Sequence, residues 1–226
     1  MDTIVAKITN DSLTDKKIYE QAGKILREGG LVAFPTETVY GLGADALDEE
    51  ASAKIYAAKG RPSDNPLIVH IADIEALYKL SCEVPDKALK LADKFWPGPL
   101  TMILKKSDIV PDSITGGLGT VAIRMPSHKV AAELIRTSGV YIAAPSANTS
   151  GKPSPTRASH VIKDLSGKID MIIEDDTVDI GVESTIIDLS EEVPTILRPG
   201  YITKEMFEEV IGVVRIDPAI TEGVKS

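Results

Sequence analysis

The segment Ala144–Thr156, which reads APSANTSGKPSPT, combines hydroxyl and amide side chains with three prolines and a single lysine. Proline fixes the backbone angle φ, whereas a flexible linker would use Gly and Ser more freely. Small polar groups on a stiff backbone predict a preorganised set of hydrogen-bond partners, because less ordering entropy is lost when a ligand binds. This segment is therefore a candidate ligand site.

Two cations lie close together in KGRPSDNPLIVH, at Lys59 and Arg61. Cations at the end of a helix also stabilise its dipole, which is the structural alternative. However, Pro62 and Pro66 bracket a short segment that is rich in hydrogen-bonding groups, and this should stiffen the loop. A lysine point charge beside an arginine fork suits a triphosphate.

Several polar residues stand beside or inside apolar strand patterns. Arg124 interrupts TVAIRM, and a buried arginine is costly unless it meets a carboxylate of the protein or of a ligand. His70 lies in another apolar run, where a hydrogen-bonded core histidine and a ligand contact both remain open. Ser184 begins one expected strand, Arg198 ends another, and Thr36 follows a third. In α/β proteins, such positions commonly build binding sites.

The usual catalytic motifs are absent from the sequence. It contains no G-x-x-x-x-G-K-[ST], since SGKP has proline where a phosphate-binding loop has its hydroxyl, and no G-x-S-x-G. No cysteine–histidine nucleophile pair stands in a suitable context. This pattern favours a reaction between bound substrates, in which the protein supplies position and charge neutralisation.

Composition narrows the class of protein. The chain has 226 residues and a formal net charge of -9, which disfavours a nucleic acid as the main ligand because phosphate binding needs a basic surface. The lone Cys82 excludes an internal disulfide and a multi-cysteine zinc site. No apolar run approaches the roughly 20 residues that cross a bilayer, and the N-terminus lacks a signal-peptide pattern. We expect a soluble cytoplasmic protein without membrane contact.

Apolar periodicity predicts alternating helices and strands, and hence an α/β fold. Helices are expected at residues 12–28, 48–60, 85–96, 127–139, 156–169 and 203–212, the first with a capping box from Ser12 to Asp15. Strands are expected at 31–34, 66–71, 100–105, 120–125, 140–145, 170–175, 184–190 and 194–200. Some strands follow one another without a helix, so the open, twisted sheet should mix parallel and antiparallel pairs. The polar tail is typical of a linker or frayed end.

Six ordered sequence blocks resemble the YrdC-like threonylcarbamoyl-AMP synthases. They are PTETVYGLGADA, KGRPSDNPLIVHI, FWPGPLTMILK, TVAIRMPSH, APSANTSGKPSPT and ESTIIDL followed by ILRPG. The resemblance implies an open α/β sheet with a concave active-site cavity. It also implies that L-threonine, bicarbonate or CO2, and ATP give threonylcarbamoyl-AMP and diphosphate. A separate threonylcarbamoyltransferase would then use this product to form N6-threonylcarbamoyladenosine at position 37 of tRNA, so tRNA would be at most an indirect partner.

The resemblance also assigns residues to the site. Lys59 and Arg61 would be the catalytic charge pair, and Mg2+ would arrive bound to ATP rather than at a protein metal site. ATP contacts are implied for Lys59, Arg61, Ser63, Thr120, Ser146, Asn148, Ser154 and Arg198. Threonine contacts are implied for Thr36, His70, Arg124, the backbone of Ala144, and Ser184. Arg124 would then pair with the carboxylate of threonine.

Two rival functions and one open domain question remain. The first rival is a non-catalytic module that binds double-stranded RNA, although the acidic balance and the lack of a basic or aromatic RNA-binding face disfavour it. The second is a carbamoyl-adenylate enzyme of hydrogenase maturation, which usually carries zinc-binding cysteines that this chain lacks. We expect a catalytic domain at 1–212, with 213–226 as a C-terminal extension or the start of an interdomain linker. The sequence leaves open whether the chain is naturally single-domain or trimmed at a boundary.

Overall fold

A computed structural model describes residues 2–9, 11–60, 62–175 and 178–221. The strands are β1 (Ile4–Lys7), β2 (Val32–Pro35), β3 (Tyr40–Asp45), β4 (Ile68–His70), β5 (Leu100–Lys105), β6 (Thr120–Arg124), β7 (Ile142–Ala143), β8 (Met171–Glu174), β9 (Thr185–Asp188), β10 (Thr195–Arg198) and β11 (Arg215–Ile216). The helices are α1 (Ser12–Arg27), α2 (Glu49–Lys59), α3 (Glu75–Leu80), α4 (Asp86–Phe95), α5 (Asp112–Thr115), α6 (Lys129–Ser138), α7 (Ala158–Leu165), α8 (Lys204–Ile211) and α9 (Pro218–Thr221).

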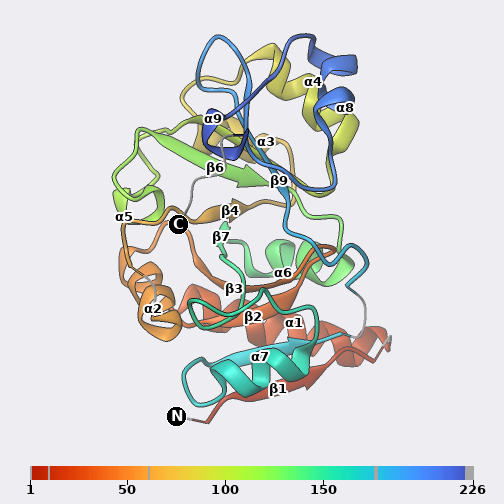
Figure 1. The fold of residues 1–226 in the computed structure, drawn as a ribbon. Helices are drawn as coiled ribbons and strands as arrows, with labels where there is room; N and C mark the ends of the chain where they lie inside the picture. Colours follow the sequence, from red (N-terminus) through yellow and green to blue (C-terminus); the bar gives the residue numbers. More distant parts are fainter. Residues whose placement is uncertain (1, 10, 61, 176–177, 222–226) are drawn as a thin grey trace.

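Across the described ranges, the strands form one mixed sheet in the order β1-β8-β2-β3-β7-β4-β6-β5-β9-β10-β11. Parallel pairs are β1/β8, β2/β8, β4/β6, β5/β9 and β10/β11, and the remaining neighbours are antiparallel. Figure 1 shows this sheet rising from β1 beside α1 to β9 near α4 and α8. The predicted fold class, an open mixed α/β sheet with flanking helices, is confirmed.

The half of the sheet near α1 is covered on both faces. Val32 and Phe34 of β2 belong to a buried cluster with α1 and α6. Ala33, between them, belongs to the other cluster, which includes Ile55 of α2 and Val161 of α7. Successive side chains of a strand point to opposite faces, so this division places α1 and α6 on one side and α2 and α7 on the other.

The half formed by β4, β6, β5 and β9 is covered differently. One face carries fully buried apolar residues that join Leu77 of α3, Leu91 of α4 and Phe207 of α8 in the core. These strand residues are Val69, Ile123, Met102 and Ile187. The alternate positions are only half-buried, and they are Ile68, Ala122, Ile103 and Ile186. This second face is therefore available to form a cleft.

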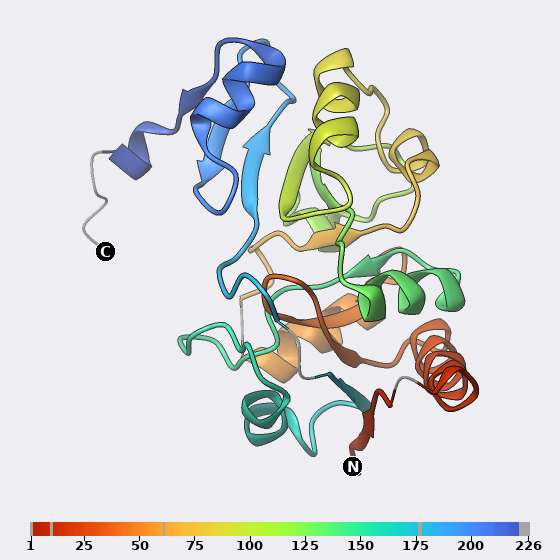
Figure 2. The same cartoon turned by 90° about the vertical axis from the view of Figure 1, so that its right-hand side faces the viewer.

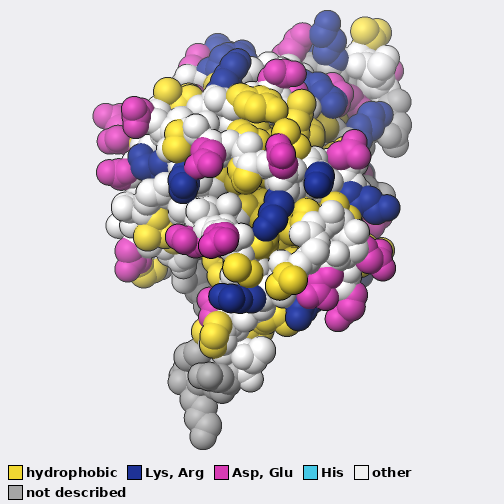
Figure 3. Space-filling model, turned by 90° about the horizontal axis from the view of Figure 1, so that it is seen from above, with side chains coloured by type: hydrophobic (Ala, Val, Ile, Leu, Met, Phe, Trp, Pro, Cys, Tyr) yellow, Lys and Arg dark blue, Asp and Glu magenta, His cyan; other side chains and the backbone are white. Residues whose placement is uncertain are grey.

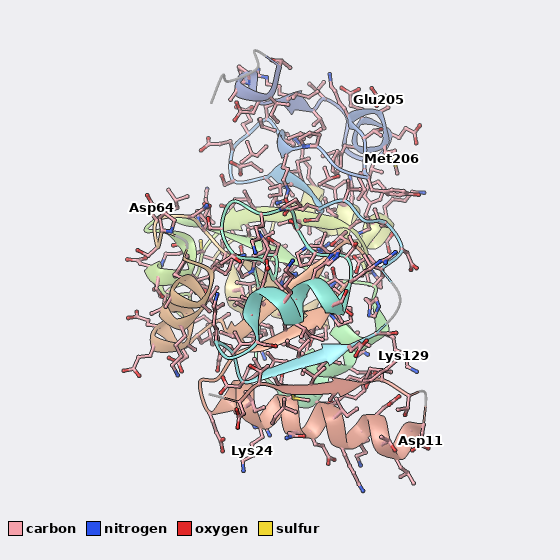
Figure 4. All side chains as sticks on the ribbon, turned by 60° about the horizontal axis from the view of Figure 1, so that its bottom comes forward. Asp11, Lys24, Asp64, Lys129, Glu205 and Met206 are labelled. Atoms are coloured by element: carbon pink, nitrogen blue, oxygen red, sulfur yellow. The ribbon has the colours of Figure 1, made fainter. Side chains whose placement is uncertain are left out.

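Helix boundaries follow local chemistry, with one correction. The predicted capping box at Ser12 is wrong, because Asp11 is the N-cap of α1 and its carboxylate accepts from the Thr14 amide at 3.0 Å. Asp15 instead accepts from the Thr9 amide. Figure 4 labels Asp11 at one end of α1 and Lys24 towards the other. The predicted N-cap of α2 at Asp48 is confirmed.

Strand β3 is an element that the sequence did not predict. The sequence predicted no strand between residues 34 and 66, yet Tyr40–Asp45 pairs with both β2 and β7. A Cβ at Gly43 would lie 2.6 Å from Ile142 Cγ2 and 2.8 Å from Phe34 Cε1. Glycine therefore marks close packing here, although it usually weakens a strand pattern.

The C-terminal segment also differs from its prediction. Residues 213–221, expected to be a linker or frayed end, contain β11 and α9. Val214 is buried, and β11 pairs in parallel with β10. Figure 2 shows this segment continuing from α8 along one side of the molecule. Within the described ranges, no helix has both the length and the apolar character that a membrane span requires.

Candidate functional site

A cleft of about 280 Å³ lies on the uncovered face of β4, β6, β5 and β9. Its wall brings together predicted site residues that are distant in the sequence. These are Thr36, His70, Arg124, Ala144, Ser146, Ser184 and Arg198. A larger hollow of about 410 Å³ lies by the start of α4 and contains none of the predicted site residues. Chemistry, rather than size, therefore identifies the candidate site.

The pairing of strands β4, β6 and β5 gives the floor of the cleft one apolar row and one polar row. Ala122 pairs with both Ile68 and Ile103, which gives an apolar row across three strands. Two residues further along β6, Arg124 pairs with His70 and Thr101, which gives a polar row. The period of two places both rows on one face. The site can thus hold a ligand with a polar end and an apolar end.

Arg124 is the buried cation of the polar row, with 4% of its side chain exposed. Its Nη2 donates to Glu37 Oε1 at 2.5 Å, and its Nη1 donates to Thr38 Oγ1 at 2.9 Å. Its Nε is buried and has no hydrogen-bond partner among the described residues. Of the two partners that the sequence left open for this charge, the structure shows a protein carboxylate.

His70 stands beside Arg124 in the polar row. Burial, followed by the positive charge of Arg124, lowers the pKa of His70 to about 3. Its Nδ1 lies 3.1 Å from the carbonyl oxygen of Ile68, and its ring packs edge-on against Phe34. At neutral pH the imidazole is therefore uncharged, and it can contribute hydrogen bonds to the cleft but no positive charge.

Arg198 is the second arginine of the cleft, and it binds the segment just before β9. Its Nη1 donates to Glu183 Oε2 at 2.6 Å, and its Nη2 donates to Ser184 Oγ at 2.9 Å. Ser184 Oγ also lies 2.7 Å from Thr101 Oγ1, which links this group to the polar row. Ser154 donates to the other oxygen of Glu183 at 2.8 Å. One carboxylate therefore bridges two predicted ATP contacts.

The proline-rich segment 144–156 is fixed along strand β3. The amides of Tyr40 and Leu42 donate to the carbonyls of Pro155 and Pro145, and the Ala147 amide donates to Tyr40. This pairing supports the prediction of a rigid polar segment. Ser146 and Ala144 reach the cleft wall from it.

The side chain of Lys59 also contacts the proline-rich segment 144–156. The side chain is buried, and its ammonium donates to the carbonyl oxygens of Ser146 and Asn148. The Asn148 amide donates in turn to the carbonyl of Lys152 at 2.7 Å. Lys59 and Asn148 thus hold the loop in this structure and are not part of the cleft wall.

The remaining predicted residues lie at the margin of the cleft or outside it. Thr120 begins β6 on the same face as Ala122, and it is half-buried. Ser63 is exposed and lines a separate hollow beside α2 and α5, where Figure 4 labels the adjacent Asp64. Arg61 lies outside the described residues. The structure therefore gathers most, but not all, of the predicted contacts.

Glu37 and Glu183 are the site residues that sequence reasoning did not select. Each carboxylate binds an arginine of the cleft, across 87 residues of sequence for Glu37 and 15 for Glu183. Acidic residues in polar segments carry no distinguishing signal. The cost of burying Arg124 required a partner but did not identify which carboxylate it would be.

An open mixed sheet whose uncovered face bears two arginines and several hydroxyls defines an α/β protein with a polar cleft on its sheet. The chain belongs to the Sua5, YciO and YrdC family: the family model, described as Telomere recombination, matches residues 24–200. The expected family resemblance is thereby confirmed.

Two relatives that are similar to this chain are named threonylcarbamoyl-AMP synthase. A threonylcarbamoyl-AMP synthase of Pyrococcus abyssi is 57% identical over 218 residues, which cover 96% of this chain and 64% of the relative. One of Bacillus subtilis is 54% identical, with 95% and 62% covered. The crystal structure of P. abyssi Sua5 complexed with L-threonine superposes with a TM-score of 0.92 at 55% identity, covering 98% and 64%. The chain thus spans less than two thirds of these relatives' length.

Proposed function

We propose that this chain synthesises L-threonylcarbamoyl-AMP from L-threonine, bicarbonate or CO2, and ATP, with release of diphosphate. The observation that carries the proposal is the cleft itself, where predicted threonine and ATP contacts from distant segments meet on one sheet face. Relatives named threonylcarbamoyl-AMP synthase support the same activity, and one solved relative is complexed with L-threonine.

The proposed reaction needs no protein nucleophile. The amine of threonine adds to CO2 and loses a proton, giving a carbamate. A carbamate oxygen then attacks the α-phosphorus of ATP, and the bond from that phosphorus to the bridging oxygen breaks as diphosphate leaves. Because two anions must approach each other, the protein has to position them and screen their charge.

The site residues divide between the two substrates in this proposal. The polar row and its neighbours contact threonine through Thr36, His70, Arg124, the Ala144 backbone and Ser184. ATP is held by Lys59, Arg61, Ser63, Thr120, Ser146, Asn148, Ser154 and Arg198, with Lys59 and Arg61 as the catalytic charge pair. Since Lys59 faces loop carbonyls here, its contact with a phosphate requires this loop to rearrange.

A metal ion would have to arrive with the nucleotide. Within the described ranges, no three or more His, Cys, Asp and Glu residues gather into a group that could hold a metal ion. The carboxylate of the cleft wall, Glu183, is already bound to Arg198 and Ser154. Mg2+ commonly keeps its waters and binds substrate phosphates, so in this proposal the ion is held mainly by ATP.

The product and the domain division complete the proposal. A tRNA threonylcarbamoyltransferase would consume the adenylate in the cytoplasm, so tRNA is at most an indirect partner. We retain 1–212 as the catalytic domain, with 213–226 as an extension or the start of a linker. The burial of Val214 and the pairing of β11 with β10 support an extension whose first residues contact the sheet.

The rival functions have less support. On the face shown in Figure 3, basic and acidic side chains are interspersed, rather than gathered into the basic surface that duplex RNA requires. The relatives named as synthases also favour the enzyme over an RNA-binding module. A carbamoyl-adenylate enzyme would exchange diphosphate into ATP without threonine, which makes this rival directly testable.

Incubation with ATP, Mg2+, bicarbonate and threonine tests the proposal. We expect threonine-dependent release of diphosphate and a product with the mass of threonylcarbamoyl-AMP. No release above background would refute the enzymatic function. Lys59→Ala and Arg61→Ala should each lower turnover, whereas Arg124→Ala should first raise the threonine concentration required. Unchanged turnover in both Lys59→Ala and Arg61→Ala would show that these residues are not the catalytic charge pair.

A further inference from the structure

Glu37 lies behind the cleft and fixes the arginine that faces it. Its Oε1 binds Arg124, and its Oε2 accepts from the backbone amides of Ser127 and His128 at 3.2 and 3.3 Å. The Glu37 side chain is only 5% exposed and is not part of the cleft wall, whereas Arg124 and Thr38 are. Glu37 therefore acts on a ligand only through the guanidinium.

The contacts of that guanidinium determine what it offers to a ligand. Glu37 and Thr38 engage Nη2 and Nη1, while Nε remains buried without a described partner. A buried donor without a partner is costly, so the described protein groups leave the guanidinium incompletely satisfied. The carboxylate of Glu37 also balances the arginine charge, which leaves a directed hydrogen bond rather than a net positive field.

We propose that Glu37 is a positioning residue for the amino-acid substrate, an inference that rests on the proposed function. It orients the guanidinium of Arg124, which lines the cleft, for the carboxylate of the substrate. The affinity for the amino-acid substrate then depends on the geometry of one buried arginine. The nucleotide end does not depend on Glu37, because Arg198 is held separately by Glu183 and Ser184.

Glu37→Gln tests this inference with little change in volume. Both oxygens of Glu37 accept from N–H donors, and an amide must place its own NH2 against one of these donors. The guanidinium or the 127–128 turn must then shift. Since a hydrogen bond to a charged group contributes about 1.5–3 kcal/mol, we expect the Kd for L-threonine to rise at least roughly tenfold. The KM for ATP should stay within about twofold, which is the experimental scatter of such values.

The matched control is Glu133→Gln. Glu133 is an exposed carboxylate that pairs with Arg136 on α6, away from the cleft, so this variant should bind both substrates like the wild type. Titration calorimetry with L-threonine and steady-state diphosphate release give the two readouts. Thermal unfolding of each variant reports stability separately.

A second variant covers the possibility that Glu37→Gln does not fold. Thr38→Val removes the acceptor for Nη1 without changing the shape of the side chain. It should raise the Kd for threonine by roughly tenfold, again without changing the KM for ATP, because the guanidinium loses a charge-assisted hydrogen bond and Thr36 loses its contact with Thr38 Oγ1.

Two outcomes would overturn the inference. One is unchanged threonine binding in whichever of these variants fold. The other is a parallel rise in both substrate constants together with lower stability, which would make Glu37 purely structural. A wild-type protein that binds no threonine would instead refute the proposed function, so the two failures are distinguishable.

Discussion

The two arginine–carboxylate pairs of the cleft have similar contact lengths but different environments. Arg124 and Glu37 lie 2.5 Å apart with 4% and 5% of their side chains exposed. Arg198 and Glu183 lie 2.6 Å apart with 32% and 38% exposed. Charge attraction is screened strongly by water and weakly in the interior, so the same contact has different energetic consequences at the two places.

This difference separates two kinds of binding surface. The buried pair lies in the sheet and fixes its arginine before a ligand arrives. The half-exposed pair joins a strand end to a loop, and either partner can turn into water at little cost. The cleft thus combines a preformed end with an adaptable end. Under the proposed function these are the amino-acid end and the nucleotide end, which suits a small ligand and a long polyanion.

Replacing each arginine by alanine should give the largest difference in stability between the two pairs. Arg124→Ala leaves the Glu37 carboxylate buried without its cation, so it should lower the free energy of unfolding by about 3–5 kcal/mol. Arg198→Ala should lower it by about 1 kcal/mol or less, because its partner reaches solvent. Urea denaturation measures both values. Equal losses would show that burial does not distinguish the pairs.

The buried end should also respond to pH through His70. Its pKa is about 3 in the folded protein, against 6.5 for an unperturbed histidine. The unfolded chain therefore binds the extra proton between these values. This contribution to stability is complete above pH 6.5 and falls by about 1.4 kcal/mol for each pH unit below it.

The histidine contribution can be isolated from other titrating groups by comparing variants. Urea denaturation between pH 6.5 and 4 should give a shallower pH dependence for His70→Gln than for the wild type. His160→Gln is the matched control, since His160 is exposed on α7. Parallel curves for the wild type and His70→Gln would show that His70 is not held in its neutral form.

Neutralising Glu183 of the exposed pair should strengthen substrate binding, whereas neutralising Glu37 should weaken it. Glu183 occupies Arg198 and Ser154, both proposed ATP contacts. Glu183→Gln removes a negative charge that competes with phosphate for Arg198. We expect the KM for ATP to fall by roughly threefold, about 0.7 kcal/mol, with the threonine constant unchanged.

A rise in the KM for ATP would contradict this comparison. It would mean that Glu183 orients Arg198 for the nucleotide, as Glu37 is proposed to orient Arg124 for threonine. Glu192→Gln provides the matched control, because Glu192 is exposed beside the larger hollow outside the cleft.

The sheet and the polar row could be predicted largely from local pattern. Strand β5 coincides with the predicted segment 100–105, and Arg124 stood out because it interrupts an apolar strand. Its cost of burial correctly required an anionic partner. Period-two alternation places His70 and Arg124 on the same face once the two strands are known to be neighbours.

The rest of the site depends on long-range packing that local sequence does not encode. Glu37 meets Arg124 only because β2 and β6 belong to one sheet, which no spacing rule reveals. Lys59 was predicted to contact ATP, yet in this structure its ammonium donates to the loop carbonyls of Ser146 and Asn148. Strand β3 was missed because its glycines permit close packing, a property that their sequence context alone does not show.

Salt should produce the smallest and most selective difference between the pairs. In a double-mutant cycle, the coupling of Arg198 with Glu183 should be about 0.2–1 kcal/mol. Between about 0.1 and 1 M salt the screening length falls from about 10 to about 3 Å, so this coupling should shrink further. The coupling of Arg124 with Glu37 should change little, because ions cannot enter a pair that is about 95% buried. Double-mutant cycles at both salt concentrations measure the two coupling free energies. Equal salt sensitivity would mean that solvent reaches the Arg124–Glu37 pair as readily as the Arg198–Glu183 pair.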